Sequence, residues 1–243
     1  MPSQAKAYIA FVIASGTMLV LLAADWWSSA NLRQFLIYLC LAAFASVLKV
    51  RIPGMEGTIS PNFVFLLLGM MALPYSQVVA ISLAAALVQS LWASAKRPRF
   101  VQVAFSAAAV ILSSSLAYGF SHLVQAGSGT ESLLVSVIFA GSAYFSVNSA
   151  LISLVIGLVE GQPLEQVCQR CYAWVFPYFI VGIAFAGLVS SVYAPSAVWK
   201  GALVLLPTMV LTYVYFLTRA ARPVPAMMVP SSAHEEYAAE VSP

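Results

Sequence analysis

The sequence predicts an all-α, polytopic integral membrane protein, a helix bundle that crosses the bilayer about eight times. Hydrophobic residues make up 62% of the chain and charged residues only 8%, against the ~25% charge of an ordinary soluble domain. Several apolar stretches approach the ~20 residues that a helix needs to cross a hydrocarbon core of ~30 Å. These stretches lack the alternation of apolar and polar residues that is typical of membrane β-barrels. We therefore expect lipid to be the main solvent of the chain.

Eight apolar runs are the candidate spans. The first follows Lys6 and ends at Asp25 without a small-residue cleavage pattern, so we expect an uncleaved span rather than a signal peptide. The second and third runs have 14 and 12 residues, so they are expected to be tilted, thinned or discontinuous spans, or one of them re-entrant. In chain order, the runs cover residues 7–24, 35–48, 62–73, 76–95, 100–124, 133–159, 172–193 and 197–218.

The distribution of lysine and arginine predicts the orientation, because basic residues are retained in cytoplasmic loops. With eight spans and both termini cytoplasmic, the outer basic residues are Arg33 and Lys200 alone. The inner set is Lys6, Lys49, Arg51, Lys96, Arg97, Arg99, Arg170, Arg219 and Arg222. A re-entrant third run would worsen this split. Trp26, Trp27 and Trp199 then fall at the outer surface, where amphipathic rings suit the headgroup layer.

We expect one transmembrane domain over residues 1–218 and a short cytoplasmic tail over residues 219–243. The tail is rich in proline and serine and carries Glu235, Glu236 and Glu240. A polar segment this short cannot bury enough apolar area to fold, so disorder is expected.

The chain carries no recognisable catalytic chemistry. It has no H-E-x-x-H, no G-x-S-x-G and no Walker-type glycine loop, so we expect a protein that is not an enzyme and has no catalytic residues. Two histidines and the pair Cys168 and Cys171 supply too few ligands for a metal, and no cofactor is expected. The spans hold essentially no ionisable residues, which disfavours a proton-coupled pump. A net charge of only +3 disfavours a nucleic-acid-binding protein.

The most distinctive segment is the loop LKVRIPGMEGTISPNFVF after the second run. Pro53, Gly54, Gly57 and Pro61 prevent a continuous helix there. Irregular backbone near a membrane is tolerated only where protein covers it or where it lines a wet cavity. The loop is therefore either a plain basic turn or a cap over a binding cavity, and both interpretations stay open.

Polar side chains inside the spans are the other candidates for a site. Asn148 is expected to be the deepest strongly polar side chain, and in lipid it must find a partner. That partner is either another helix or a ligand. The candidate ligand-binding residues are Asn148, Ser146, Tyr144, Glu56, Asn62 and Gln89.

The segment from Ala42 to Trp92, with LKVRIPGMEGTIS and FVFLLLG, resembles the bacterial membrane-associated sensor regions of the MASE type that precede GGDEF and HD-GYP domains. The later segments FSVNSALISLVIGLVEGQPL, WVFPYFIVGIAFAGL and WKGALVLLPTMVLTYVYF are similar too. The resemblance implies a bundle in the bacterial cytoplasmic membrane that senses a small molecule or a lipid and signals to a cytoplasmic partner. The sequence departs from the pattern after Arg222, where 21 residues remain and no cyclase or phosphodiesterase follows. We therefore expect either a stand-alone relative or an isolated portion of a longer protein.

Two other hypotheses remain. The same central segment resembles the S-components of energy-coupling-factor importers, whose early loop covers a substrate pocket, although those proteins usually have six spans. That resemblance implies a small-molecule transporter. The third hypothesis is a structural membrane subunit. The expected partners are membrane lipids and an unidentified small molecule, with a homo-oligomer left open.

Overall fold

In a computed structural model, the described part of the chain comprises residues 1–48, 50–51, 58–92, 98–128, 133–192 and 198–205, with residues 207, 210 and 214 beyond them. Side chains of residues 50–51, 58–59, 127–128 and 169–175 are not described. The predicted tail, Glu56, and most of the eighth run after residue 205 therefore lie outside the described residues.

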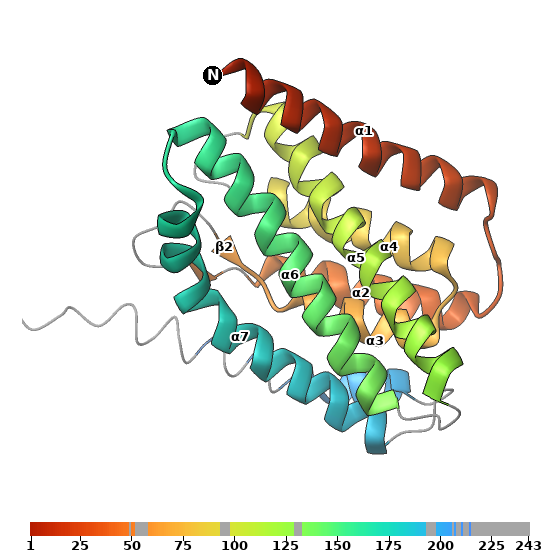
Figure 1. Ribbon diagram of the computed structural model, residues 1–243. Coiled ribbons are helices and arrows are strands. Elements are labelled where there is room, and N and C mark those ends of the chain that lie inside the picture. Colours follow the sequence, from red (N-terminus) through yellow and green to blue (C-terminus); the bar gives the residue numbers. More distant parts are fainter. Residues whose placement is uncertain are drawn as a thin grey trace, which may run out of the picture.

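Helices make up nearly all of the described chain, and the predicted all-α fold is confirmed at that level (Figure 1). The helices are α1 (Ser3–Asp25), α2 (Leu32–Val47), α3 (Asn62–Ala72), α4 (Tyr75–Leu91), α5 (Phe100–Ser128), α6 (Leu133–Glu160) and α7 (Leu164–Val192). Residues 198–205 are also helical. Between α2 and α3, β1 (Val50–Arg51) pairs antiparallel with β2 (Thr58–Ile59), with Val50 opposite Ile59. This strand pair stands where the sequence predicted an irregular turn.

Three helices in the described part are long and apolar enough to cross a membrane, namely Ser3–Asp25, Phe100–Ala126 and Leu133–Glu160. The other apolar segments are shorter, and they are Leu32–Val47, Asn62–Ala72, Tyr75–Leu91 and Phe176–Val192. The helices coincide with the first seven predicted runs within a few residues, except that α7 begins at Leu164 rather than at residue 172.

The shortest of the seven labelled helices, α3, occupies the centre of the bundle. It contacts α2, α4, α5, α6 and α7, and its residues 62–70 are all buried. Their side chains form the main hydrophobic core together with residues from the surrounding helices. At a rise of 1.5 Å per residue, α3 is only about 17 Å long, well short of a hydrocarbon core of ~30 Å. Protein rather than lipid therefore surrounds this helix on all sides.

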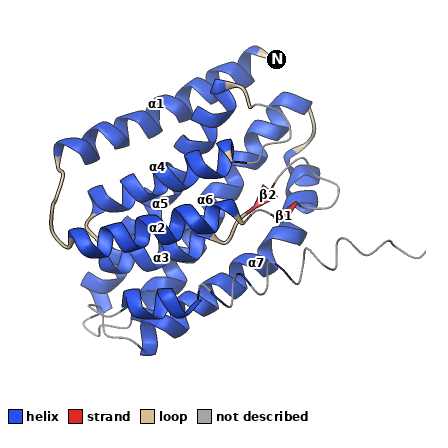
Figure 2. Cartoon of the chain, turned by 180° about the vertical axis from the view of Figure 1, so that it is seen from behind, coloured by secondary structure: helices blue, strands red, loops and turns tan. Residues whose placement is uncertain are grey.

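The bundle has two distinct ends, because successive helices run in opposite directions. At one end, here the Trp26 end, Gln77 at the start of α4 donates from Nε2 to the carbonyl oxygens of Ser28 (2.9 Å) and Ala30 (2.6 Å). At the same end Arg33 lies 5.4 Å from the ring centroid of Trp199. The opposite end, here the Asn62 end, holds the β1–β2 pair and the start of α3 (Figure 2). The predicted outer residues Trp199 and Arg33 thus lie together.

Two glycine residues allow the outer helices α1 and α7 to pack closely against their neighbours. A Cβ atom at Gly16 in α1 would lie 2.6 Å from Cβ of Ala108 in α5. A Cβ atom at Gly182 in α7 would collide with the ring of Phe63 in α3. Glycine is thus required where α1 meets α5 and where α7 meets α3, and α1 and α7 lie at opposite edges of the bundle in both views (Figure 1 and Figure 2).

Candidate functional site

A polar junction joins three helices at the Asn62 end. Nδ2 of Asn62, the first residue of α3, donates to Oγ of Ser46 in α2 (3.0 Å) and to Oε1 of Gln89 in α4 (3.1 Å). The Ser46 hydroxyl in turn donates to the carbonyl oxygen of Ala42 at 2.7 Å. An amide in an apolar bundle needs such partners, because an unpaired polar group is costly there. The junction therefore fixes where α3 begins relative to α2 and α4.

A second contact ties α7 to the segment that leads into α3. The hydroxyl of Tyr178 donates to the carbonyl oxygen of Ser60 at 2.6 Å. Ser60 follows β2 directly, and Pro177 lies inside α7 beside Tyr178. Because proline removes a backbone donor from the helix, this part of α7 is a natural point of bending. Tyr178 thus links the segment that follows β2 to α7.

An aromatic cluster lies next to the junction, with Phe63 at its centre. The ring centroid of Phe63 is 4.4 Å from that of Phe179, 5.6 Å from that of Tyr178 and 6.1 Å from that of Tyr144. Phe145 extends the cluster, at 4.8 Å from Phe179. Rings from α3, α6 and α7 therefore meet directly beside the polar junction.

Ser60 is another polar residue of this region. It is buried, and its hydroxyl oxygen makes no hydrogen bond to any residue that the structure describes. A buried hydroxyl without a partner costs about 1–3 kcal/mol, so it is a candidate contact for a bound molecule. Together, the junction, the rings and this hydroxyl place polar groups beside an apolar aromatic surface.

The structure brings together three of the six predicted site residues. Asn62 and Gln89 share a hydrogen bond, and the buried Tyr144 belongs to the aromatic cluster. Ser146 is exposed and Asn148 is half-buried. No hydrogen bond of Asn148 is found among the described residues, whereas Asn62 and Gln77 are more deeply buried than it is. Glu56 lies outside the described residues.

Four contributors to the site were not singled out from the sequence, namely Ser46, Phe63, Phe145 and Phe179. Ser46 interrupts an apolar run, and that isolated position was the only signal for it. Phe63 looked like an ordinary apolar residue of a short span, and nothing in the sequence marked it as the centre of a ring cluster.

Some of the other polar side chains of the spans link two helices, whereas others bond within their own helix. Oγ of Ser82 in α4 donates to Oγ of Ser114 in α5 at 2.9 Å, deep in the bundle. His122 is exposed, and its ring stacks on Tyr118 at 4.0 Å near the end of α5. Within the described ranges, no three His, Cys, Asp or Glu side chains lie close enough to hold a metal ion.

Comparison of the chain with protein-family models, with curated proteins and with solved structures finds no match.

Proposed function

We propose that the chain is a multi-pass protein of the bacterial cytoplasmic membrane that senses a small molecule or a lipid at its Asn62 end. The observation that carries the proposal is the junction of Asn62 with Ser46 and Gln89, placed directly after the β1–β2 pair. Irregular backbone beside a membrane is tolerated where it lines a cavity or is covered by protein. Here it leads into a short buried helix that touches most of the bundle.

The proposed topology has eight spans with both termini cytoplasmic. The three long apolar helices support membrane insertion, and the shorter ones complete the bundle around α3. In this topology nine basic residues lie inside and two outside, and both outer ones lie close to the Trp199 ring. The Asn62 end then faces the cytoplasm and the Trp26 end the outer surface.

The proposed signal passes from the β1–β2 pair to α7. A ligand that contacts the Ser60 hydroxyl shifts the Ser60 carbonyl, and Tyr178 follows because it bonds that carbonyl. The movement spreads along α7 from Pro177, and a cytoplasmic partner reads the result. The ligand must bind the two arrangements of α7 with different affinity, since equal affinity would shift nothing.

A transporter is the second candidate, because substrate sites of secondary transporters often lie beside short or broken helices such as α3. The two candidates differ in what happens to the ligand. A sensor keeps its ligand, whereas a transporter carries it across the bilayer. A purely structural subunit would do neither.

The test is native mass spectrometry of the protein in mild detergent, with the variants Asn62→Leu and Asn148→Leu. We expect a small molecule that accompanies the wild type, stays with Asn148→Leu and is lost from Asn62→Leu. Monodisperse gel-filtration profiles confirm that each variant is folded. No adduct beyond bulk lipid in the wild type would argue for a structural subunit.

A second experiment separates sensing from transport and tests the topology. The identified molecule is offered to proteoliposomes, where accumulation inside the vesicles would support the transporter. Tyr178→Phe removes the hydroxyl that bonds Ser60, so a sensor variant should still bind but lose its response to the ligand. Reporter fusions at both termini should be active only in the cytoplasm, and an external terminus would overturn the topology.

A further inference from the structure

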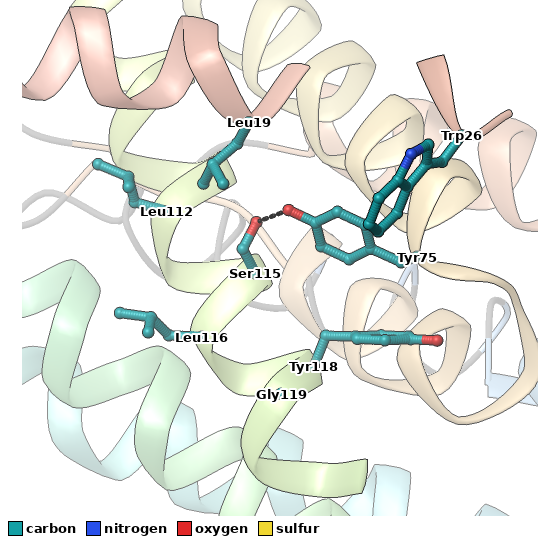
Figure 3. Close-up of a pocket in the computed structure, with 8 residues that line it drawn as sticks. All are labelled: Leu19, Trp26, Tyr75, Leu112, Ser115, Leu116, Tyr118 and Gly119. Atoms are coloured by element: carbon teal, nitrogen blue, oxygen red, sulfur yellow. Dashed lines mark hydrogen bonds between the residues drawn. The ribbon is translucent and has the colours of Figure 1, made fainter. Parts of the chain in front are cut away.

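A recess of about 570 Å³ opens between α1, α4 and α5 on the side of the bundle away from the Asn62 junction (Figure 3). Trp26 lies at one end of the recess, and Leu19 and Leu112 lie at the other. Tyr75, from α4, lies between α1 and α5. The remaining lining residues are Ser115, Leu116, Tyr118 and Gly119. Its volume falls in the usual range of ~300–1,000 Å³ for ligand sites.

The packing of α1 on α5 explains the recess. The two helices touch most closely at Gly16 and Ala108, where small residues allow the backbones to approach. Helices that cross at an angle diverge on either side of their closest point. The recess begins about one turn further along each helix, at Leu19 and Leu112, and it extends toward Trp26.

The lining selects an apolar occupant. The hydroxyls of Tyr75 and Ser115 lie 3.0 Å apart and bond each other, so neither needs a ligand (Figure 3). The Tyr75 ring packs against Tyr118 at 5.4 Å. Leucine side chains and the open space at Gly119 make up much of the rest, and a Cβ atom at Gly119 would meet nothing within 4 Å. A hydrocarbon chain satisfies this surface, whereas a polar molecule would lose its hydration without compensation.

The surroundings indicate that this hydrocarbon belongs to a membrane lipid. Both α1 and α5 are long and apolar enough to span a bilayer. From Leu19 to Trp26 the helix rises about 10 Å, roughly a third of the hydrocarbon thickness. Trp26 is 76% exposed, as expected of a ring at the headgroup layer. The recess is continuous with the exposed apolar band at Leu116 and Phe120.

We propose that the recess holds one acyl chain of a membrane lipid, whose headgroup lies beside Trp26. The proposal rests on the membrane placement given under the proposed function, and it concerns the opposite end of the bundle from the Asn62 junction. The bound chain fills the gap between α1 and α5 and so fixes the outer half of α1 against the bundle.

The test uses proteoliposomes of phosphatidylethanolamine and phosphatidylglycerol that contain a phospholipid with a photoactivatable diazirine in its acyl chain. Gly119→Leu adds a large apolar side chain at a lining position where a Cβ atom meets nothing within 4 Å. It also replaces a poor helix former by a good one, so we expect the variant to fold. Ala184→Leu is the matched control, because Ala184 is an exposed residue of α7 at the far edge of the bundle. Phe139 in α6, 51% exposed, provides the reference for bulk lipid contact.

In the wild type we expect labelling of residues 112–119 at least fivefold above labelling at Phe139. Gly119→Leu should reduce the recess labelling to the reference level, and Ala184→Leu should leave it unchanged. Recess labelling no higher than at Phe139, or unchanged in Gly119→Leu, would overturn the proposal. So would a detergent-stable dimer that Gly119→Leu dissociates, since a second copy would then fill the recess.

If the protein is not inserted in the membrane at all, the same experiments give a result that differs from failure of the acyl-chain proposal. A protein released from membranes by alkaline carbonate and unlabelled at Phe139 would defeat both this proposal and the proposed function. A protein that is retained and labelled at Phe139 but not in the recess would defeat the acyl-chain proposal alone.

Discussion

The two apolar helices α1 and α3 differ in their exposure to the surroundings of the protein. In α1, 23 residues long, Phe11 is 69% exposed, and most of the helix faces outward. In α3, 11 residues long, Phe63 is 2% exposed, and residues 62–70 are all buried. Both helices are strongly apolar, so hydropathy alone does not distinguish them.

The difference shows what apolar character means in each helix. In the proposed membrane placement, the outward face of α1 contacts lipid. Lipid tails are as apolar as leucine, so that face gains little from contact with protein. The side chains of α3 fill a close-packed interior, where each lost methylene leaves a cavity. We therefore expect α3 to respond strongly to small changes in side-chain volume and α1 to respond weakly.

The largest expected effect comes from truncating the two phenylalanines. Phe63→Ala removes the centre of the aromatic cluster and should cost about 3–5 kcal/mol of unfolding free energy. Phe11→Ala should change it by no more than about 0.5 kcal/mol, since its ring lies at the surface. Reversible SDS titration in mixed micelles measures both. Equal effects of the two substitutions would show that α3 is not the protein-enclosed core.

Much of this contrast could be predicted from sequence, but not all of it. The apolar runs located α1, α3, α5 and α6 to within a few residues, because long unbroken hydropathy has few alternatives in lipid. The 12-residue third run also predicted a short element. That it lies at the centre, in contact with α7, could not be predicted, because long-range packing leaves no periodic signal in a run that is apolar on every side.

The apolar run covers only the later part of α7, for a related physical reason. The run begins at residue 172, but the helix begins at Leu164, after Pro163. The backbone N–H groups of Gln166 and Val167 bond the carbonyl oxygen of Pro163. Glu165 and the neighbouring polar residues lower the hydropathy of this first part without interrupting the helix, since proline is well tolerated at a helix start.

The candidate site was predictable as a set of residues but not as a geometry. Asn62, Gln89 and Tyr144 stood out as polar groups in apolar surroundings, and they do lie in one region. The bond between Asn62 and Gln89 joins residues 27 positions apart, on helices whose relative rotation the sequence does not specify. Ser46 can bond Asn62 only because α2 and α3 have a particular rotation relative to each other, which the sequence does not specify either.

A smaller effect on the unfolding free energy is expected when a methyl group is added at Gly182 in α7 or at Gly119 in α5. Gly182→Ala places a Cβ atom against the Phe63 ring and should cost about 1–3 kcal/mol through overpacking. Gly119→Ala meets open space and should stabilise the helix by about 0.5–1 kcal/mol. The same SDS titration compares them. A neutral Gly182→Ala would mean that α7 and α3 can separate at no cost.

The smallest effect concerns hydrogen bonds rather than volume. A double-mutant cycle with Asn62→Leu and Gln89→Leu should give a coupling energy of about 0.6 kcal/mol, the mean for hydrogen bonds between membrane helices, and at most about 1.7 kcal/mol. Thr17→Val in α1 is the control, because the Thr17 hydroxyl bonds only the carbonyl oxygen of Ile13 within its own helix. It should change stability by less than about 0.5 kcal/mol. A coupling energy near zero would show that the Asn62 amide does not hold α3 to α4, and the proposed route from the β1–β2 pair would then depend on Tyr178 alone.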